Sequence, residues 1–163
     1  MNVNVNKKIV EFFATGFFVG KLPFAPGTYG TLVAVPIAYL LLHCSALVYM
    51  ASCVVVLLFA VFVSDLHERN TGAHDMSEIV IDEIIGYLIT MTWLPLTWQS
   101  FVAGFVLFRI FDIVKPPPIR QMDQRIEGGL GTVLDDVAAG LVSSIILQIV
   151  YAKTTWLGVQ LHG

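Results

Sequence analysis

Long stretches without a charged side chain constrain this sequence more than any other feature. No Asp, Glu, Lys or Arg occurs in residues 22–64, 84–108 or 137–152. A helix that crosses a bilayer needs about 20 mostly apolar residues, so the first stretch is long enough for two membrane helices. A soluble protein would have to be far larger to bury so much apolar sequence. The sequence therefore predicts an integral membrane protein.

The overall composition supports the same class of protein. Only 13% of the residues are charged, compared with about 25% in typical soluble domains. The net charge of −3 gives no basis for binding nucleic acid. The length of 163 residues predicts a single membrane-embedded domain over residues 1–163.

The predicted fold is all-α, a membrane bundle of about five membrane helices. Residues 4–20 mix lysine with phenylalanine, a pattern typical of an interfacial amphipathic helix at the N-terminus. Two prolines and two glycines in residues 21–30 predict a shaped loop. Residues 65–78 and 119–132 are expected to form polar loops. The membrane helices are expected at residues 31–43, 46–64, 79–92, 98–113 and 133–152.

The third apolar stretch allows two topologies. Residues 84–108 are long enough to cross the membrane once, or they form a hairpin that turns at "WLPLTW". The hairpin gives helices of only about 20 Å, but it places Trp93 and Trp98 at the far interface. The hairpin also leaves only Lys153 on the far side and places the other basic residues on the near side. Such an excess of Lys and Arg is expected of a cytoplasmic face. We therefore favour the hairpin, with the N-terminus inside. The basic residues on the near side are Lys7, Lys8, Lys21, Arg69, Arg109, Lys115, Arg120 and Arg125.

Two acidic pairs stand at the heads of apolar helices. Asp82 and Glu83 occur in "VIDEIIG", and Asp135 and Asp136 occur in the similar "VLDDVAAG". One such pair alone is explained by the helix dipole, which stabilises an acid by about 0.3–1 kcal/mol. Two pairs at one membrane face would repel each other and lose hydration, and a divalent cation relieves both costs. Ligands that are all oxygen suit Mg²⁺ or Mn²⁺ rather than Zn²⁺.

Further charged residues occur at helical spacing near these pairs. If helix extends back from Asp82, then Asp75 and Glu78 fall near the same face and offer additional ligands.

A second charged stripe consists of Arg109, Asp112 and Lys115, which are spaced by three and end at "KPPP". These residues either form a salt bridge whose long side chains extend to the membrane surface, or they bind phosphate through their positive charges beside the metal site.

Four segments together resemble the signature blocks of the phosphatidylglycerophosphatase A family. They are "LPFAPGTYGTL", "HDMSEIVIDEIIG", "FRIFDIVKPPPI" and "GGLGTVLDDVAAG", in the family's order and over nearly the whole chain. The resemblance implies a Mg²⁺-dependent lipid phosphatase of the bacterial inner membrane. Such an enzyme converts phosphatidylglycerol phosphate, a phospholipid substrate, to phosphatidylglycerol, and we expect its active site on the cytoplasmic side.

The resemblance and the charge pattern together suggest roles for the site residues. We expect Asp82, Glu83, Asp135 and Asp136 to bind the metal or act as the base, with a metal-bound water attacking phosphorus. A covalent aspartyl intermediate through Asp112 or Asp82 is the alternative. The residues expected to contact the substrate phosphate are Lys21, Thr28, Arg109 and Lys115.

Two other functions remain open from the sequence. A phospholipid-synthesis transferase also uses an acidic Mg²⁺ site, but usually carries a spaced D-x₂-D-G type motif, of which "DDVAAG" has only part. A small ion-coupled transporter would place its acids near the membrane midplane, whereas these acids are predicted at helix ends.

Overall fold

The computed structural model describes residues 6–73, 76–117, 119 and 128–158 of the chain. The regular elements in these ranges are helices, and no strand occurs among them. The helices are α1 (Lys7–Ala14), the 3₁₀ helix η1 (Val19–Lys21), α2 (Pro26–Leu42), α3 (Ala46–Thr71), α4 (Ile81–Thr90), α5 (Trp98–Val114) and α7 (Gly129–Lys153).

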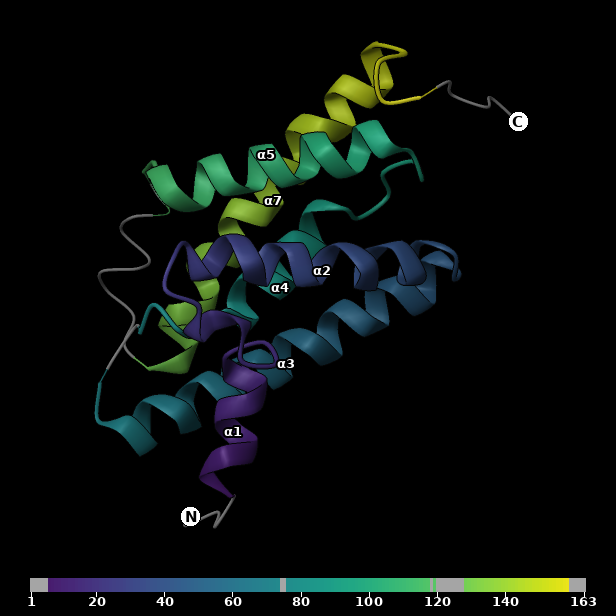
Figure 1. Cartoon of the computed structure of the whole chain (residues 1–163). Helices are drawn as coiled ribbons and strands as arrows, with labels where there is room; N and C mark the ends of the chain where they lie inside the picture. Colours follow the sequence, from purple (N-terminus) through teal and green to yellow (C-terminus); the bar gives the residue numbers. More distant parts are fainter. Residues whose placement is uncertain (1–5, 74–75, 118, 120–127, 159–163) are drawn as a thin grey trace.

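Helix α4 is the centre of the bundle. It contacts α2, α3, α5 and α7, and eight of its ten residues are buried. Figure 1 shows α4 behind α2, between α3 and α5, while α1 packs against α3. The core is therefore built around a helix of about 15 Å, roughly half the thickness of a bilayer's hydrocarbon layer.

The two ends of the bundle differ in chemistry. Helices α2, α4 and α7 begin at one end of the bundle, and α5 ends there. We call this end the acid end. The last turns of α5 share a cavity there with the first turns of α2, α4 and α7. At the opposite, far end, the Thr97 hydroxyl donates a 2.7 Å hydrogen bond to the Leu157 carbonyl, which links the start of α5 to the segment after α7. The alternating direction of the helices thus gathers their charged ends at one face.

The two helices of the predicted hairpin are present as α4 and α5. Residues 91–97 join them, and Trp93 adopts a left-handed conformation (φ 59°) within this turn. Thr97 begins α5, since its side chain accepts a hydrogen bond from the Ser100 amide. At the other end of α5, Lys115 is left-handed (φ 42°) and prolines follow, which prevents the helix from continuing.

The outer surfaces of the long helices are apolar. Helices α3 and α7 are long and apolar enough to cross a membrane, and α2 is a shorter apolar helix. Large side chains such as Leu58 of α3 (67% exposed) and Ile149 of α7 (57% exposed) face outward along them. Soluble monomers rarely expose large contiguous apolar surfaces, so these faces are suited to lipid.

The prediction of a polar loop over residues 65–78 is wrong for its first part. Helix α3 continues to Thr71 because its polar residues find partners: Asp65 pairs with Arg69 at 2.8 Å, and the Thr132 hydroxyl of α7 donates to Glu68 at 2.5 Å. The helix ends at Gly72, which takes the left-handed conformation (φ 75°) common after helices.

The N-terminal helix is shorter than the predicted range 4–20. It ends at Ala14 because Gly16, Phe17 and Phe18 are all left-handed. Its buried residues belong to a small apolar cluster with Val63 of α3.

Two other boundaries differ by about a turn. Helix α2 already begins at Pro26, inside the predicted loop 21–30, and α7 begins at Gly129 rather than at residue 133. Proline is well suited to the first position of a helix, which explains the earlier start of α2.

Candidate active site

A polar cavity of about 240 Å³ lies at the acid end of the bundle. Helices α2, α4, α5 and α7 and the segment before α4 all contribute to its wall. Two larger cavities, of about 370 and 360 Å³, are lined mainly by apolar residues and contain no acid. The charged lining residues of the polar cavity are Asp82, Glu83, Arg109, Asp112, Lys115, Asp135 and Asp136.

The first acidic pair occupies the first turn of α4. Val80 precedes this helix and provides no side-chain cap, while Asp82 Oδ1 accepts a 3.0 Å hydrogen bond from the Glu83 amide. Negative charge is favourable at this position because the helix dipole is positive at its start. The apolar residues that follow bury α4 and hold both carboxylates at the cavity wall.

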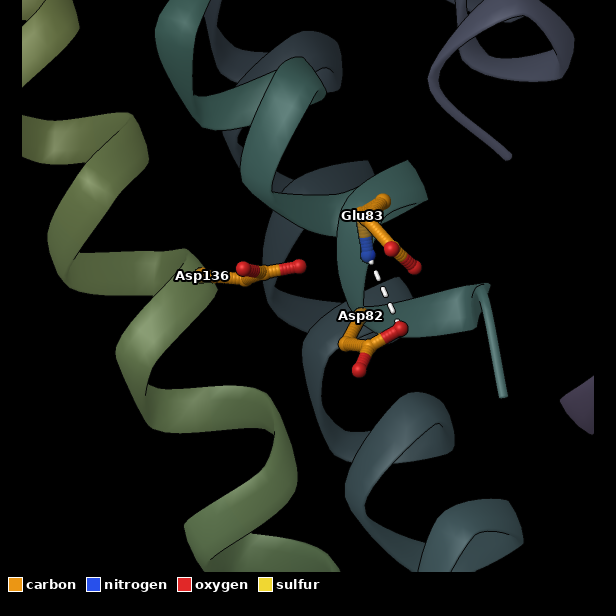
Figure 2. Close-up of side chains that lie close together, drawn as sticks. All are labelled: Asp82, Glu83 and Asp136. Carbon is orange, nitrogen blue, oxygen red and sulfur yellow. Dashed lines mark hydrogen bonds between the residues drawn. The ribbon is translucent and has the colours of Figure 1, made fainter. Parts of the chain in front are cut away.

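Carboxylates from α4 and α7 converge on one point. One oxygen each from Asp82, Glu83 and Asp136 lie within 4.8 Å of one another, a separation that suits a shared metal ion. Asp82 is only 7% exposed and Asp136 only 3%. Figure 2 shows Asp136 reaching from α7 toward the start of α4, where Asp82 and Glu83 lie. The sequence prediction that the two acidic pairs meet at one site is therefore confirmed for these three residues.

The fourth predicted metal ligand lies in a different environment. Asp135 Oδ2 is 2.5 Å from the Lys115 ammonium, which reaches α7 from the end of α5. Asp135 is outside the group of three acids whose oxygens converge. Its position suggests that it orients Lys115 at the cavity wall.

The stripe on α5 forms a second ionic contact at the cavity. Arg109 forms an ion pair with Asp112, and its Nη1 also lies 3.6 Å from Glu83 Oε1 of α4. These side chains are only 12–14% exposed. Each acidic pair thus contributes one carboxylate near a cation: Glu83 near Arg109, and Asp135 beside Lys115.

Two predicted phosphate contacts lie outside this arrangement. Among the described residues, neither Lys21 nor Thr28 is part of the cavity lining, although Gly27 is. Lys21 instead forms an ion pair with Glu11 of α1. The hydrogen bond from Lys21 holds the pKa of Glu11 below its usual value, and the same bond raises the pKa of Lys21.

The additional acidic stripe predicted before Asp82 is wrong. Helix α4 starts only at Ile81, so Glu78 does not share its face. Glu78 Oε1 lies 2.9 Å from His67 Nε2 of α3 instead. Asp75 lies outside the described residues.

Three features of the site fit a divalent cation. Five carboxylates line the cavity against two basic side chains, so negative charge is in excess. The Glu83 Oε2 atom is buried and has no hydrogen-bond partner among the described residues. The donors at the point of convergence are all carboxylate oxygens, which magnesium and manganese prefer.

Sequence reasoning missed several uncharged wall residues. A methyl group on Gly27 would lie 2.0 Å from Glu83 Oε1 and 2.8 Å from Arg109 Nη1, so a larger residue here would displace these two side chains. Met76, Ser77 and Ile79 also line the cavity. Gly27, Met76, Ser77 and Ile79 all lie within the sequence motifs, but the spacing of residues in those motifs does not indicate which of them face the cavity.

Comparisons with known proteins agree with the chemistry of this cavity. The family model described as phosphatidylglycerophosphatase A matches residues 12–151. The chain is 40% identical over 141 residues to the Escherichia coli protein named phosphatidylglycerophosphatase A, covering 86% of this chain and 82% of that protein. The protein of the same name from Haemophilus influenzae is 35% identical over 153 residues, covering 91% of this chain and 90% of its own length.

A third relative has a different name. A Bacteroides thetaiotaomicron protein named putative phosphatidylinositol-3-phosphatase is 41% identical over 142 residues, covering 83% of this chain and 89% of that protein. No solved structure matches the chain.

Proposed function

This chain belongs to the phosphatidylglycerophosphatase A family, and on that premise we propose that it hydrolyses phosphatidylglycerol phosphate to phosphatidylglycerol and inorganic phosphate. The reaction would complete the synthesis of phosphatidylglycerol. One observation carries the proposal beyond family membership. Carboxylates of α4 and α7 converge within 4.8 Å, in a cavity that also contains Arg109 and Lys115. That combination would hold a metal ion and a phosphate group side by side.

We propose that the metal is Mg²⁺ and that Asp82, Glu83 and Asp136 bind it. Bound there, Mg²⁺ would offset the charge of the acids, polarise the phosphate and activate water as the nucleophile. The protein's own contribution is a fixed set of oxygen ligands on two packed helices. The burial of these acids keeps bulk water from weakening their attraction for the cation.

Arg109 and Lys115 are the proposed phosphate contacts. Both line the cavity, and each is oriented by a carboxylate: Arg109 by Asp112 and Lys115 by Asp135. Cations held in place before the substrate arrives stabilise the charge that develops on phosphate oxygens during hydrolysis. Since Asp112 is engaged with Arg109, we favour direct attack by water over a covalent intermediate through Asp112.

We further propose that α2, α3, α4, α5 and α7 are embedded in the bacterial inner membrane with the acid end facing the cytoplasm. The apolar outer faces of the helices support embedding. Trp93, Trp98 and Trp156 are all more than 60% exposed around the far end, where a membrane interface would lie. The phosphorylated head group of a lipid in the cytoplasmic leaflet would then reach the cavity without leaving the bilayer.

The orientation is testable with a native cysteine. Cys44 is exposed between α2 and α3 at the far end, whereas Cys53 is buried. We expect a membrane-impermeant maleimide to label Cys44 when it is added to intact spheroplasts, and the Cys44→Ser variant to remain unlabelled. Labelling that requires lysis of the spheroplasts would reverse the proposed orientation.

The activity is tested with purified protein in detergent. We expect phosphate release from phosphatidylglycerol phosphate to stop when a chelator removes divalent cations, and to return when Mg²⁺ is added. Phosphatidic acid and phosphatidylinositol 3-phosphate serve as comparison substrates, because one relative carries the name of a phosphoinositide phosphatase. Release that persists in chelator would contradict the metal assignment, and a preference for either comparison lipid would contradict the proposed substrate.

A further inference from the structure

The glycines of the two repeated motifs, Gly86 and Gly140, bring the backbones of α4 and α7 close together. A methyl group on Gly140 would lie 2.4 Å from the Gly86 carbonyl oxygen. A methyl group on Gly86 would lie 2.9 Å from the Asp136 carbonyl oxygen and 2.6 Å from the ring of Phe108 on α5. Because these obstacles include backbone atoms, rotation of a side chain does not relieve them.

These glycines lie one helical turn from the converging carboxylates. Gly86 follows Asp82 by four residues on α4, and Gly140 follows Asp136 by four residues on α7. Residues four apart share one face of a helix, so each acid stands directly beside its glycine on the surface where α4 and α7 meet.

Helices α4 and α7 run in the same direction. Their contacts progress in the same order along both, from the Asp82–Asp136 approach to the Gly86–Gly140 contact and then to the 3.3 Å hydrogen bond from Gln148 to the Thr92 carbonyl. The first turn of α4 therefore lies beside Asp136, which is about two turns into α7, as Figure 2 shows for the acids. The distance between the helix axes at the glycines sets the separation of the carboxylates one turn away.

From this geometry we infer that Gly86 and Gly140 are positioning residues that set the spacing of the metal-binding carboxylates and thereby select a small cation. Small residues allow membrane helices to approach closely. Mg²⁺ requires nearly octahedral oxygens at about 2.0–2.1 Å, whereas Ca²⁺ accepts flexible arrangements at about 2.3–2.6 Å. An increase in the separation of α4 and α7 therefore lowers the affinity for Mg²⁺ more than the affinity for Ca²⁺. This inference rests on the metal site proposed above.

The decisive variant is Gly140→Ala. Cβ contacts below 3.0 Å essentially never occur, so the methyl group and the Gly86 carbonyl oxygen must move at least 0.6 Å apart, and we expect α7 to shift away from α4 as a result. We expect Mg²⁺ affinity to fall by about tenfold, the lower end of losses caused by residues that support metal ligands. Ca²⁺ affinity is expected to fall less, so the ratio of Mg²⁺ to Ca²⁺ affinity declines.

Binding is measured without turnover. Mn²⁺ bound to the purified protein in detergent is followed by electron paramagnetic resonance, and Mg²⁺ and Ca²⁺ are titrated as competitors. Gly104→Ala is the matched control, because its methyl group would meet the flexible Met91 sulfur at 2.7 Å toward the far end of α4. We expect that variant to keep the wild-type affinity ratio.

Each outcome separates this inference from the proposed function. Wild-type protein that binds no Mn²⁺ would contradict the metal site itself. Binding by wild type with an unchanged Mg²⁺ to Ca²⁺ ratio in folded Gly140→Ala, or an equal change in Gly104→Ala, would overturn the spacing role alone.

If Gly140→Ala fails to fold, Thr90→Val provides the test. Its hydroxyl donates to the Gly86 carbonyl at 3.0 Å and lies 3.5 Å from the Gly140 carbonyl, so valine removes the polar link at nearly constant volume. A smaller decline of the same ratio is expected, and no change would overturn the inference.

Discussion

Replacing Asp136 by asparagine is expected to lower kcat/KM on phosphatidylglycerol phosphate by about 10³-fold, with the same result for Asp82→Asn. Both side chains are almost fully buried and offer oxygens to the shared point between α4 and α7. Asparagine keeps the size of aspartate but removes one negative charge, so the affinity for a divalent cation falls with the rate. Phosphate release at a series of Mg²⁺ concentrations measures both effects.

The control for these variants is Asp65→Asn. Asp65 lies on α3 and pairs with Arg69, which is 72% exposed, so we expect its replacement to leave kcat/KM within about twofold of wild type. Full turnover by Asp82→Asn or Asp136→Asn, with unchanged dependence on Mg²⁺, would remove these residues from the metal site. Loss of activity in all three variants would indicate a general effect on folding.

The second large effect is expected for Arg109→Met. This change leaves Glu83 and Asp112 without the cation that lies between them, in a region where all three side chains are at most 14% exposed. Breaking a buried ion pair costs about 3–5 kcal/mol of stability. Activity is expected to fall by about 10²–10³-fold because a phosphate contact is lost as well.

Two further arginine variants separate charge from geometry. Arg109→Lys keeps the positive charge but lacks the planar fork that pairs with carboxylate and phosphate, so we expect only part of the activity and stability to return. Arg69→Met is the matched control, since its exposed pair with Asp65 contributes about 0.3–0.5 kcal/mol. Thermal unfolding in detergent and phosphate release are measured together. An Arg109→Met protein with wild-type stability and rate would contradict both assigned contacts.

The helices were largely predictable because each apolar stretch is bounded by strong signals. The two helices on either side of "WLPLTW" follow from the tryptophan positions and the distribution of basic residues, and the stop at "KPPP" follows from its prolines. The extension of α3 through residues 65–71 was not predictable in this way. Its polar residues are typical of a loop, and partners such as Thr132 for Glu68 and Glu78 for His67 come from other parts of the chain.

The meeting of the two acidic pairs was predictable, but the division of roles within each pair was not. Adjacent residues on a helix point about 100° apart, so Asp135 and Asp136 face different neighbours. Which of them meets α4 and which meets Lys115 depends on the rotation of α7 about its own axis. The close approach of Gly140 to Gly86 agrees with Asp136 facing α4, because Asp136 precedes Gly140 by four residues and shares its face of α7.

The enclosure of α4 also determines when activity first arises during biosynthesis. A segment of ten residues is too short to cross a membrane alone, so in the proposed membrane arrangement α4 would be held in place only after its neighbours have been inserted. Its most extensive partner, α7, leaves the ribosome after the other described helices and brings Asp136 with it. We therefore expect the nascent chain to be inactive on its lipid substrate until α7 has been translated and has packed against α4.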